Sequence, residues 1–117
     1  MENMKKINQI NQQLEILGVK INTPEIEIMG TGLVGNINVD YNFLVQKLGQ
    51  PTESDGYKID AEWNIEFDDG TVATIYNYKD GKNYLGEDGL DVEEITDWHV
   101  GGKSNKSLKL VKEYLGL

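Results

Sequence analysis

The chain has 117 residues, the size of one domain, and a formal net charge of −9. All eleven basic residues are lysine, which disfavours nucleic-acid binding through a general basic surface and leaves no arginine clamp for phosphate. The absence of cysteine excludes disulfides and thiolate metal sites, and one histidine does not support a multi-histidine zinc site. No apolar run approaches the ~20 residues that span a bilayer, and the first six residues lack the apolar segment of a signal peptide. We therefore expect a cytoplasmic protein with no membrane partner, no direct nucleic-acid binding, no metal and no cofactor.

The N-terminal quarter predicts a helix followed by β structure. Apolar residues recur at helical spacing between Asn3 and Leu17, and Gly18 suits the end of that helix. Val19–Asn22 and Glu25–Met29 then predict either one interrupted strand or two short ones. Pro24 lacks an N–H, so this segment belongs at a sheet edge. An exposed edge strand around Ile26 would leave room for a homodimer.

Residues 30–35 match the motif GxGxxG, but the residues around them do not fit a dinucleotide-binding site. The dinucleotide fingerprint needs a helix that begins inside the glycines, and residues 36–39 do not start a helix. We interpret this segment as a turn or bulge. The next helix is predicted from Asp40, as its N-cap, to Leu48, with Gly49 and Pro51 ending it.

The clearest pattern in the chain is a β-hairpin over residues 58–79. Apolar and charged residues alternate from Lys58 to Phe67, and a second β-rich run follows the Asp-Gly turn at residues 69–70. Two registers are open at this stage. A two-residue turn pairs Phe67 with Val72, whereas a three-residue turn with a glycine bulge pairs Phe67 with Thr71.

The C-terminal part completes an α+β fold. Ile95–Val100 predicts a third strand of a meander, which Gly101 and Gly102 end, and a helix runs from Ser104 or Asn105 to about Leu115. We expect a single domain, residues 1–117, with an antiparallel sheet built on the central hairpin. Helices are expected near the N-terminus, in the middle and at the C-terminus.

The first candidate site is the acidic loop over residues 86–94. A negative patch could dock on a lysine- and arginine-rich groove by charge complementarity. The alternative is a solvated loop between strands. The protein-binding residues predicted here are Glu87, Asp88, Asp91, Glu93 and Glu94.

The second candidate site is a ligand-binding face of the predicted sheet. Aromatic side chains stack on flat ligands, and lysine can meet a phosphate. The alternative is ordinary cross-strand pairing on a solvated face. The predicted ligand-binding residues are Lys58, Glu62, Trp63, Tyr76, Tyr78, Lys79, Trp98 and His99.

Two weaker candidates involve anions and acid–base chemistry. Backbone N–H groups at Gly101 and Gly102 could cradle an anion ahead of the last helix. Carboxylate pairs such as Asp68 with Asp69, or Glu93 with Glu94, could act as acid and base or bind a cation. A small hydrolase remains a further alternative, although no nucleophile–base set is recognisable.

Several segments together resemble the small, acidic, arginine-free proteins that bacterial viruses encode against host defence, such as anti-CRISPR proteins. These segments are residues 48–51, 55–58, 62–63, 70–76 and 98–102. The resemblance implies either a block on a host nuclease or the sequestration of a nucleotide signal. The leading hypothesis is a non-enzymatic inhibitor that binds a host defence protein with a basic surface. A nucleotide-binding protein is the alternative.

Overall fold

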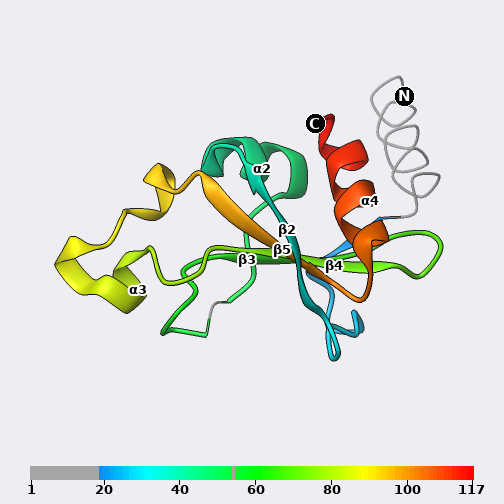
Figure 1. Ribbon diagram of the computed structural model, residues 1–117, viewed down its shortest axis with the longest axis horizontal. Coiled ribbons are helices and arrows are strands. Elements are labelled where there is room, and N and C mark those ends of the chain that lie inside the picture. Colours follow the sequence, from blue (N-terminus) through cyan, green and yellow to red (C-terminus); the bar gives the residue numbers. More distant parts are fainter. Residues whose placement is uncertain (1–18, 54) are drawn as a thin grey trace, which may run out of the picture.

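A computed structural model describes residues 19–53 and 55–117, so the helix predicted over residues 3–17 lies outside the described residues. An antiparallel five-stranded sheet carries α2 and α4 on one face (Figure 1). The strands, in their order across the sheet, are β1 (Lys20–Ile21), β3 (Glu62–Glu66), β4 (Val72–Tyr76), β5 (Asp97–Gly102) and β2 (Gly32–Asn38). The helices are α2 (Tyr41–Leu48), α3 (Lys82–Leu85) and α4 (Asn105–Leu115), with 3-10 turns η1 (Gly86–Asp88) and η2 (Val92–Glu94). The predicted α+β class is confirmed. No helix within these described ranges is long and apolar enough to cross a membrane.

The central hairpin has the three-residue turn of the two predicted alternatives. The Phe67 N–H donates to the Thr71 carbonyl over 2.8 Å, and the Gly70 N–H donates back to the Phe67 carbonyl over 2.9 Å. Gly70 has φ +86°, a conformation that glycine adopts without a Cβ clash. This register sets Trp63 opposite Ile75 and Tyr76 opposite Glu62, so the tryptophan and the tyrosine lie on opposite faces.

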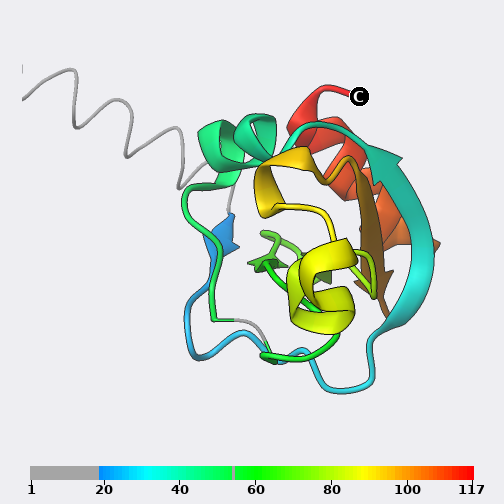
Figure 2. The same cartoon turned by 90° about the vertical axis from the view of Figure 1, so that its left-hand side faces the viewer.

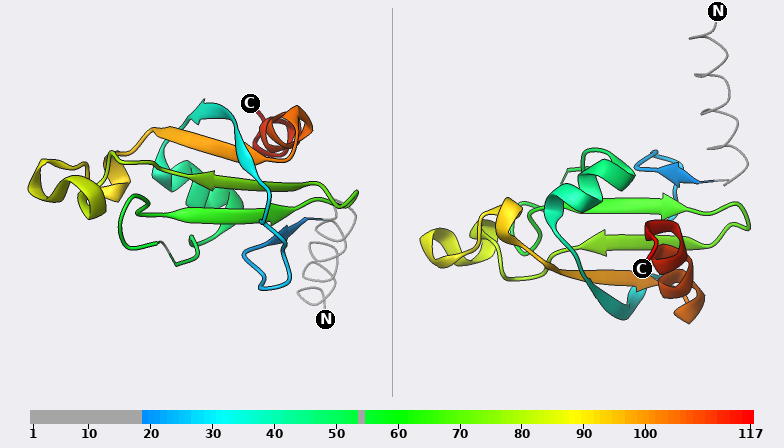
Figure 3. Two further views of the ribbon diagram at one scale, coloured as in Figure 1. Left: turned by 60° about the horizontal axis from the view of Figure 1, so that its bottom comes forward. Right: turned by 90° about the horizontal axis from the view of Figure 1, so that it is seen from above.

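The hydrophobic core lies between the sheet and the helices α2 and α4, which both lie over the strands in the right-hand view of Figure 3. Alternation in β3, β4 and β5 sends one apolar set to this face. The core residues with 0% exposure are Leu44, Trp63, Ile65, Ala73, Ile75, Ile95, Trp98, Val100 and Val111. The two tryptophans meet edge to face, with ring centroids 5.4 Å apart. This core holds the sheet against the two helices, and the opposite face of the sheet is its outer face.

Both described long helices begin and end close to the predicted residues. Asp40 precedes α2 in an extended conformation, and Leu44 and Leu48 are its buried residues. Ser104 is the N-cap of α4, and its Oγ accepts a hydrogen bond from the Lys106 N–H over 3.3 Å. The two predicted helix boundaries are therefore confirmed.

The strand predicted over Glu25–Met29 is wrong. Because β1 and β2 are the two edges of the sheet, residues 22–31 must cross the strands rather than run along them. Figure 2 shows this connection passing along the face opposite α2 and α4. Within this connection the Ile26 side chain is buried, with 8% exposure, whereas Ile28 is exposed. The edge strand that suggested a homodimer is not formed.

The glycine-rich segments belong to strands rather than to flexible turns. Gly32–Asn38 is the edge strand β2, with the predicted bulge between Leu33 and Gly35. Gly101 and Gly102 are the last two residues of β5, where they pair with both β4 and β2, rather than a turn that follows the strand. A Cβ at Gly102 would stand 2.3 Å from the Ser107 Cβ, which explains the glycine by close packing. The predicted anion cradle ahead of α4 is therefore wrong.

Candidate functional site

The segment that follows β4 protrudes beyond the end of the sheet (Figure 1, yellow-green to yellow) and is called here the acidic tip, residues 82–94. Its two ends are joined at the base, where Gly81 pairs with Leu90 and the Leu90 N–H donates to the Asp80 carbonyl over 3.0 Å. Lys82 and Asp91 form an ion pair across the base, with Nζ and Oδ1 2.8 Å apart. These contacts close the base of the tip.

The five predicted acidic residues are all exposed, but they have different neighbours. The Lys82 ammonium lowers the pKa of Asp91, and the Asp91 backbone N–H donates to Glu94 Oε1 over 3.2 Å. Glu87 and Asp88 lie in η1, at the outer end of the tip, and within residues 19–53 and 55–117 their carboxylates form no hydrogen bond or ion pair. The charge of Glu93 acts on Tyr41 in the body of the protein, so the carboxylates best presented to a partner at the outer end are Glu87 and Asp88.

Exposed apolar side chains flank these two carboxylates. Tyr84, Leu85 and Leu90 have 38%, 44% and 42% of their surface exposed. All three belong to the tip, as Glu87 and Asp88 do, so the tip exposes apolar and acidic side chains together. Exposed apolar surface with a charged rim is a common composition of protein–protein contact surfaces.

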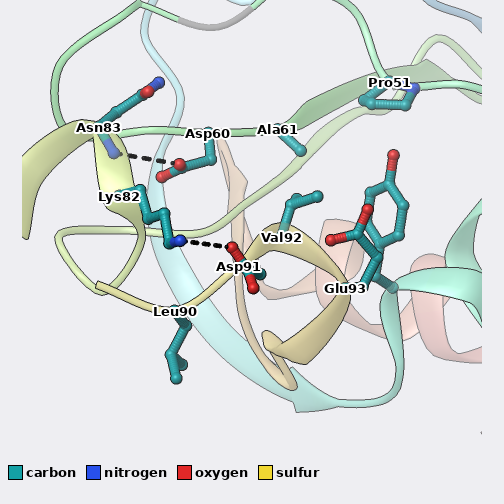
Figure 4. Close-up of a pocket in the computed structure, with 10 residues that line it drawn as sticks. Pro51, Asp60, Ala61, Lys82, Asn83, Leu90, Asp91, Val92 and Glu93 are labelled. Carbon is teal, nitrogen blue, oxygen red and sulfur yellow. Dashed lines mark hydrogen bonds and ion pairs between the residues drawn. The ribbon is translucent and has the colours of Figure 1, made fainter. Parts of the chain in front are cut away.

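A hollow of about 340 Å³ separates the tip from the body of the protein (Figure 4). Figure 4 shows Lys82 turned toward Asp91 and Asp60 turned toward the Asn83 backbone, whose N–H donates to Asp60 Oδ2 over 3.2 Å. Burial, and then the Glu93 charge, raise the pKa of Tyr41 on the opposite wall. The lining residues are Tyr41, Pro51, Asp60, Ala61, Lys82, Asn83, Leu90, Asp91, Val92 and Glu93. The hollow at the base of the tip is thus lined by three carboxylates, those of Asp60, Asp91 and Glu93.

The tip is fastened to the hairpin by Asn77, whose side chain is fully buried. Asn77 Oδ1 accepts the backbone N–H groups of Asp60 over 2.7 Å and Ala61 over 3.1 Å. Asn77 Nδ2 donates to Asp60 Oδ1 over 2.9 Å and to Asp80 Oδ1 over 3.0 Å. One amide therefore joins the start of β3, the end of β4 and the base of the tip.

Beside the tip, tyrosine rings and lysine ammonium groups alternate around a closed circuit. The Lys58 Nζ lies 5.6 Å from the Tyr57 ring centroid and 6.0 Å from that of Tyr78. The Lys79 Nζ lies 5.3 Å from Tyr78 and 5.4 Å from Tyr84. Tyr57 and Tyr84 close the circuit, with ring centroids 5.5 Å apart. These five residues are called the tyrosine–lysine circuit.

The circuit continues onto the open face of the sheet through His99. The His99 ring lies 5.7 Å from Tyr78 and 5.5 Å from Tyr76. Strand pairing sets Glu62, Tyr76, His99 and Asn36 in one row across β3, β4, β5 and β2. Burial raises the pKa of both Glu62 and Tyr76. Of the eight predicted ligand-binding residues, six therefore share this region.

The prediction that Trp63 and Trp98 bind a ligand is wrong. Both are fully buried on the core face. Their indole N–H groups donate to backbone carbonyls, Trp63 to Gly49 over 2.8 Å and Trp98 to Val39 over 3.0 Å. Because the pleat turns alternate residues to opposite faces, neither indole can stack on a ligand beside His99.

Tyr57 and Tyr84 are the aromatic residues that sequence reasoning missed. A signal for Tyr57 exists, because the dipeptide Tyr-Lys occurs at both ends of the hairpin, as Tyr57-Lys58 and Tyr78-Lys79. The Lys79 N–H donates to the Lys58 carbonyl over 2.8 Å, which sets these dipeptides side by side. Tyr84 joins them only through the fold of the tip.

Of the carboxylate pair Asp68 and Asp69, predicted as a weaker candidate site at the hairpin turn, Asp69 is engaged in contacts within the fold. Asp69 forms an ion pair with Lys106, and its Oδ1 accepts the Thr71 N–H over 2.9 Å. The hydrogen bonds from Lys106 and Thr71 hold the pKa of Asp69 well below its usual range. Within the described ranges, no group of three or more histidine, aspartate and glutamate side chains is arranged to hold a metal ion.

Comparison of the sequence with protein-family models finds no match, and comparison with curated proteins finds none either.

Proposed function

We propose that this chain is a non-enzymatic binding protein that uses its acidic tip to cover a basic surface of another protein. The observation that carries the proposal is the composition of the tip. Its outer end presents Glu87 and Asp88, neither paired within the described ranges, next to the exposed apolar residues Tyr84, Leu85 and Leu90.

The two kinds of side chain have separate tasks in such a contact. Buried apolar and aromatic anchors supply most of the binding free energy of an interface. Carboxylates around them speed association with a positive surface and select against acidic partners. The contacts at the base of the tip, from Lys82 to Asp91 and from Gly81 to Leu90, order the tip before binding. An ordered tip loses less conformational entropy when it binds.

A partner that fits this tip has an apolar centre surrounded by lysine and arginine. Proteins that handle nucleic acid carry such positive grooves, and an acidic protrusion competes with the phosphate backbone for them. The resemblance to small phage-encoded proteins would make the partner a host defence protein and this chain its inhibitor. A second candidate function, nucleotide binding, is favoured by the tyrosine–lysine circuit and is argued below.

The test is affinity capture from a bacterial lysate with three forms of the whole chain: wild type, Glu87→Lys with Asp88→Lys, and Glu25→Lys with Glu113→Lys. The last form has the same net charge as the second, but its substitutions lie away from the tip. We expect wild type and the control to capture the same basic protein and the tip variant to lose it. Equal capture by all three forms would contradict the proposal.

The apolar part of the contact is tested separately with Leu85→Ala combined with Leu90→Ala. Both side chains are exposed, so the fold should tolerate their truncation. We expect weaker capture that salt does not restore, because the lost contacts are apolar. Unchanged capture would show that the tip binds by charge alone, contrary to the composition argued here.

A further inference from the structure

The end of the outer sheet face that lies beside the acidic tip, opposite α2 and α4, has the groups needed for a second site. We propose that Tyr78, His99, Lys58 and Lys79 bind a mononucleotide. In this site the base stacks on the Tyr78 and His99 rings, and the phosphate lies between the two lysine ammonium groups. None of these four residues belongs to the acidic tip, although the site borders it, because the Lys79 Nζ lies 5.4 Å from the ring centroid of Tyr84 in the tip.

The Tyr78 ring lies beside His99 and remains partly exposed to solvent. Tyr78 is 40% exposed and its ring is inclined by 36° to that of His99, with centroids 5.7 Å apart. The Tyr76 ring also contacts His99, with centroids 5.5 Å apart and the rings nearly perpendicular at 73°. The described helices α2 and α4 pack on the opposite face (Figure 3). A base stacked on an aromatic side chain gains about 1–3 kcal/mol.

The two lysines favour an anion at this point. The sequence has twenty carboxylate residues, yet neither Lys58 nor Lys79 forms an ion pair within residues 19–53 and 55–117, although the Lys58 charge contributes to lowering the pKa of Asp55. Both ammonium groups instead lie over tyrosine rings, at 5.3–6.0 Å from the centroids of Tyr78 and its neighbours. A phosphate between them would gain two charge-assisted hydrogen bonds next to the stacked base.

The surrounding charge selects a mononucleotide over a nucleic-acid strand. Strand binding needs a row of cations that displaces counterions along the backbone. Here the two lysines adjoin the acidic tip of a chain with net charge −9, which repels further phosphates. One base with one phosphate group is therefore the ligand class that matches both the rings and the charge.

His99 makes the test direct, because it is the one histidine in the sequence and its ring protons give isolated NMR signals. The probes are AMP, adenosine and inorganic phosphate, each titrated into the whole chain at constant ionic strength. We expect AMP to move the His99 signals upfield in a saturable way, with a dissociation constant on the order of 1 mM or tighter. Adenosine should bind more weakly, and phosphate alone should give no upfield ring-current shift.

Two variants and one control complete the test. Tyr78→Ala and the pair Lys58→Ala with Lys79→Ala should each weaken AMP binding by about tenfold or more. The pair Lys103→Ala with Lys109→Ala, which removes the same charge elsewhere, should leave the affinity within about threefold. Near-ultraviolet circular dichroism of the buried tryptophans checks that each variant is folded.

Three outcomes would overturn the inference. His99 signals that AMP does not move would exclude the site. Equal shifts of the His99 signals by AMP and inorganic phosphate would show nonspecific anion binding. An equal loss of AMP affinity in the Lys103→Ala with Lys109→Ala control would show the same. Tighter binding per nucleotide by a single-stranded oligonucleotide than by AMP would assign the surface to nucleic acid instead.

Discussion

Trp63 and Trp98 meet edge to face, and each donates its indole N–H to the backbone at a different end of α2, Trp63 to Gly49 and Trp98 to Val39. The two indoles therefore fix the helix at both ends while they fill the core beneath it. Because they occupy the inner face, Tyr76, Tyr78 and His99 are turned to the opposite one, where the proposed nucleotide site lies.

Trp63→Phe and Trp98→Phe should each destabilise the protein by about 1–3 kcal/mol. Each change removes a hydrogen bond to a helix end and leaves a gap in the core. Urea unfolding followed by far-ultraviolet circular dichroism measures the loss. Since the rings touch, the double variant should lose less than the sum of the single losses. Strict additivity would show that the two indoles act independently.

Asn77→Ala should destabilise the protein by about 2–4 kcal/mol, because the Asp60 and Ala61 backbone N–H groups lose their acceptor. Thermal and urea unfolding measure the change. Asn42→Ala, an exposed substitution in α2, is the matched control and should stay within about 0.5 kcal/mol of wild type. A similar loss in both variants would mean that the Asn77 network has no special role.

Gly102→Ala should cost about 1–3 kcal/mol, because the added Cβ would stand 2.3 Å from the Ser107 Cβ and Oγ. Ser107 cannot easily yield, since its Oγ donates to the Val72 carbonyl over 2.7 Å. Gly32→Ala on the paired strand adds a Cβ with no atom within 4 Å and should be nearly neutral. Urea midpoints compare the two, and equal midpoints would contradict the packing argument.

Asp69 should give the protein an acid-sensitive contribution to stability. Hydrogen bonds from Lys106 and Thr71 lower its pKa in the folded state, so its contribution is present above its ordinary pKa of 3.8. The contribution is lost as the pH falls below that value. Wild type should therefore be more stable than Asp69→Asn at pH 7, and the two melting temperatures should converge in acid. A difference that persists unchanged at pH 2 would contradict this reasoning.

Glu62 should have the opposite pH dependence. Burial raises its pKa above the ordinary value of 4.5, so the folded state holds this proton more tightly than the unfolded state. Its ionisation therefore lowers stability as the pH rises through the interval above 4.5. Glu62→Gln should gain stability relative to wild type across that interval, as melting temperatures from pH 4 to pH 8 would show. A constant difference between the two proteins would count against it.

Local patterns predicted the hairpin, α2 and α4, because each depends on residues close together in the sequence. Residues 25–28 also alternate, yet they form no strand, since the connection from β1 to β2 has to cross the sheet. β2 was missed because its glycines resemble a turn, whereas in the sheet Gly35 packs against Leu108, whose Cδ2 would lie 2.6 Å from an added Cβ. These features depend on distant partners, which local patterns do not contain.

The candidate surfaces were predictable to a similar degree. Alternation in β3 already assigns Trp63 to the apolar face, and the three-residue turn then decides that Tyr76 and Tyr78 lie opposite it. The acidic residues of the tip are evident in the sequence, but their different roles are not. Only the folded tip distinguishes Asp91, paired with Lys82, from Glu87 and Asp88 at the outer end.

The most direct test of the proposed function is the salt dependence of the complex between this chain and the partner it captures. Calorimetry at several sodium chloride concentrations would compare wild type, the Glu87→Lys and Asp88→Lys variant, and the Glu25→Lys and Glu113→Lys control. We predict that wild type and control lose affinity steeply as salt rises, and that the tip variant binds weakly at every concentration. An affinity that is independent of salt, or unchanged in the tip variant, would contradict the proposal that the acidic tip binds a basic surface.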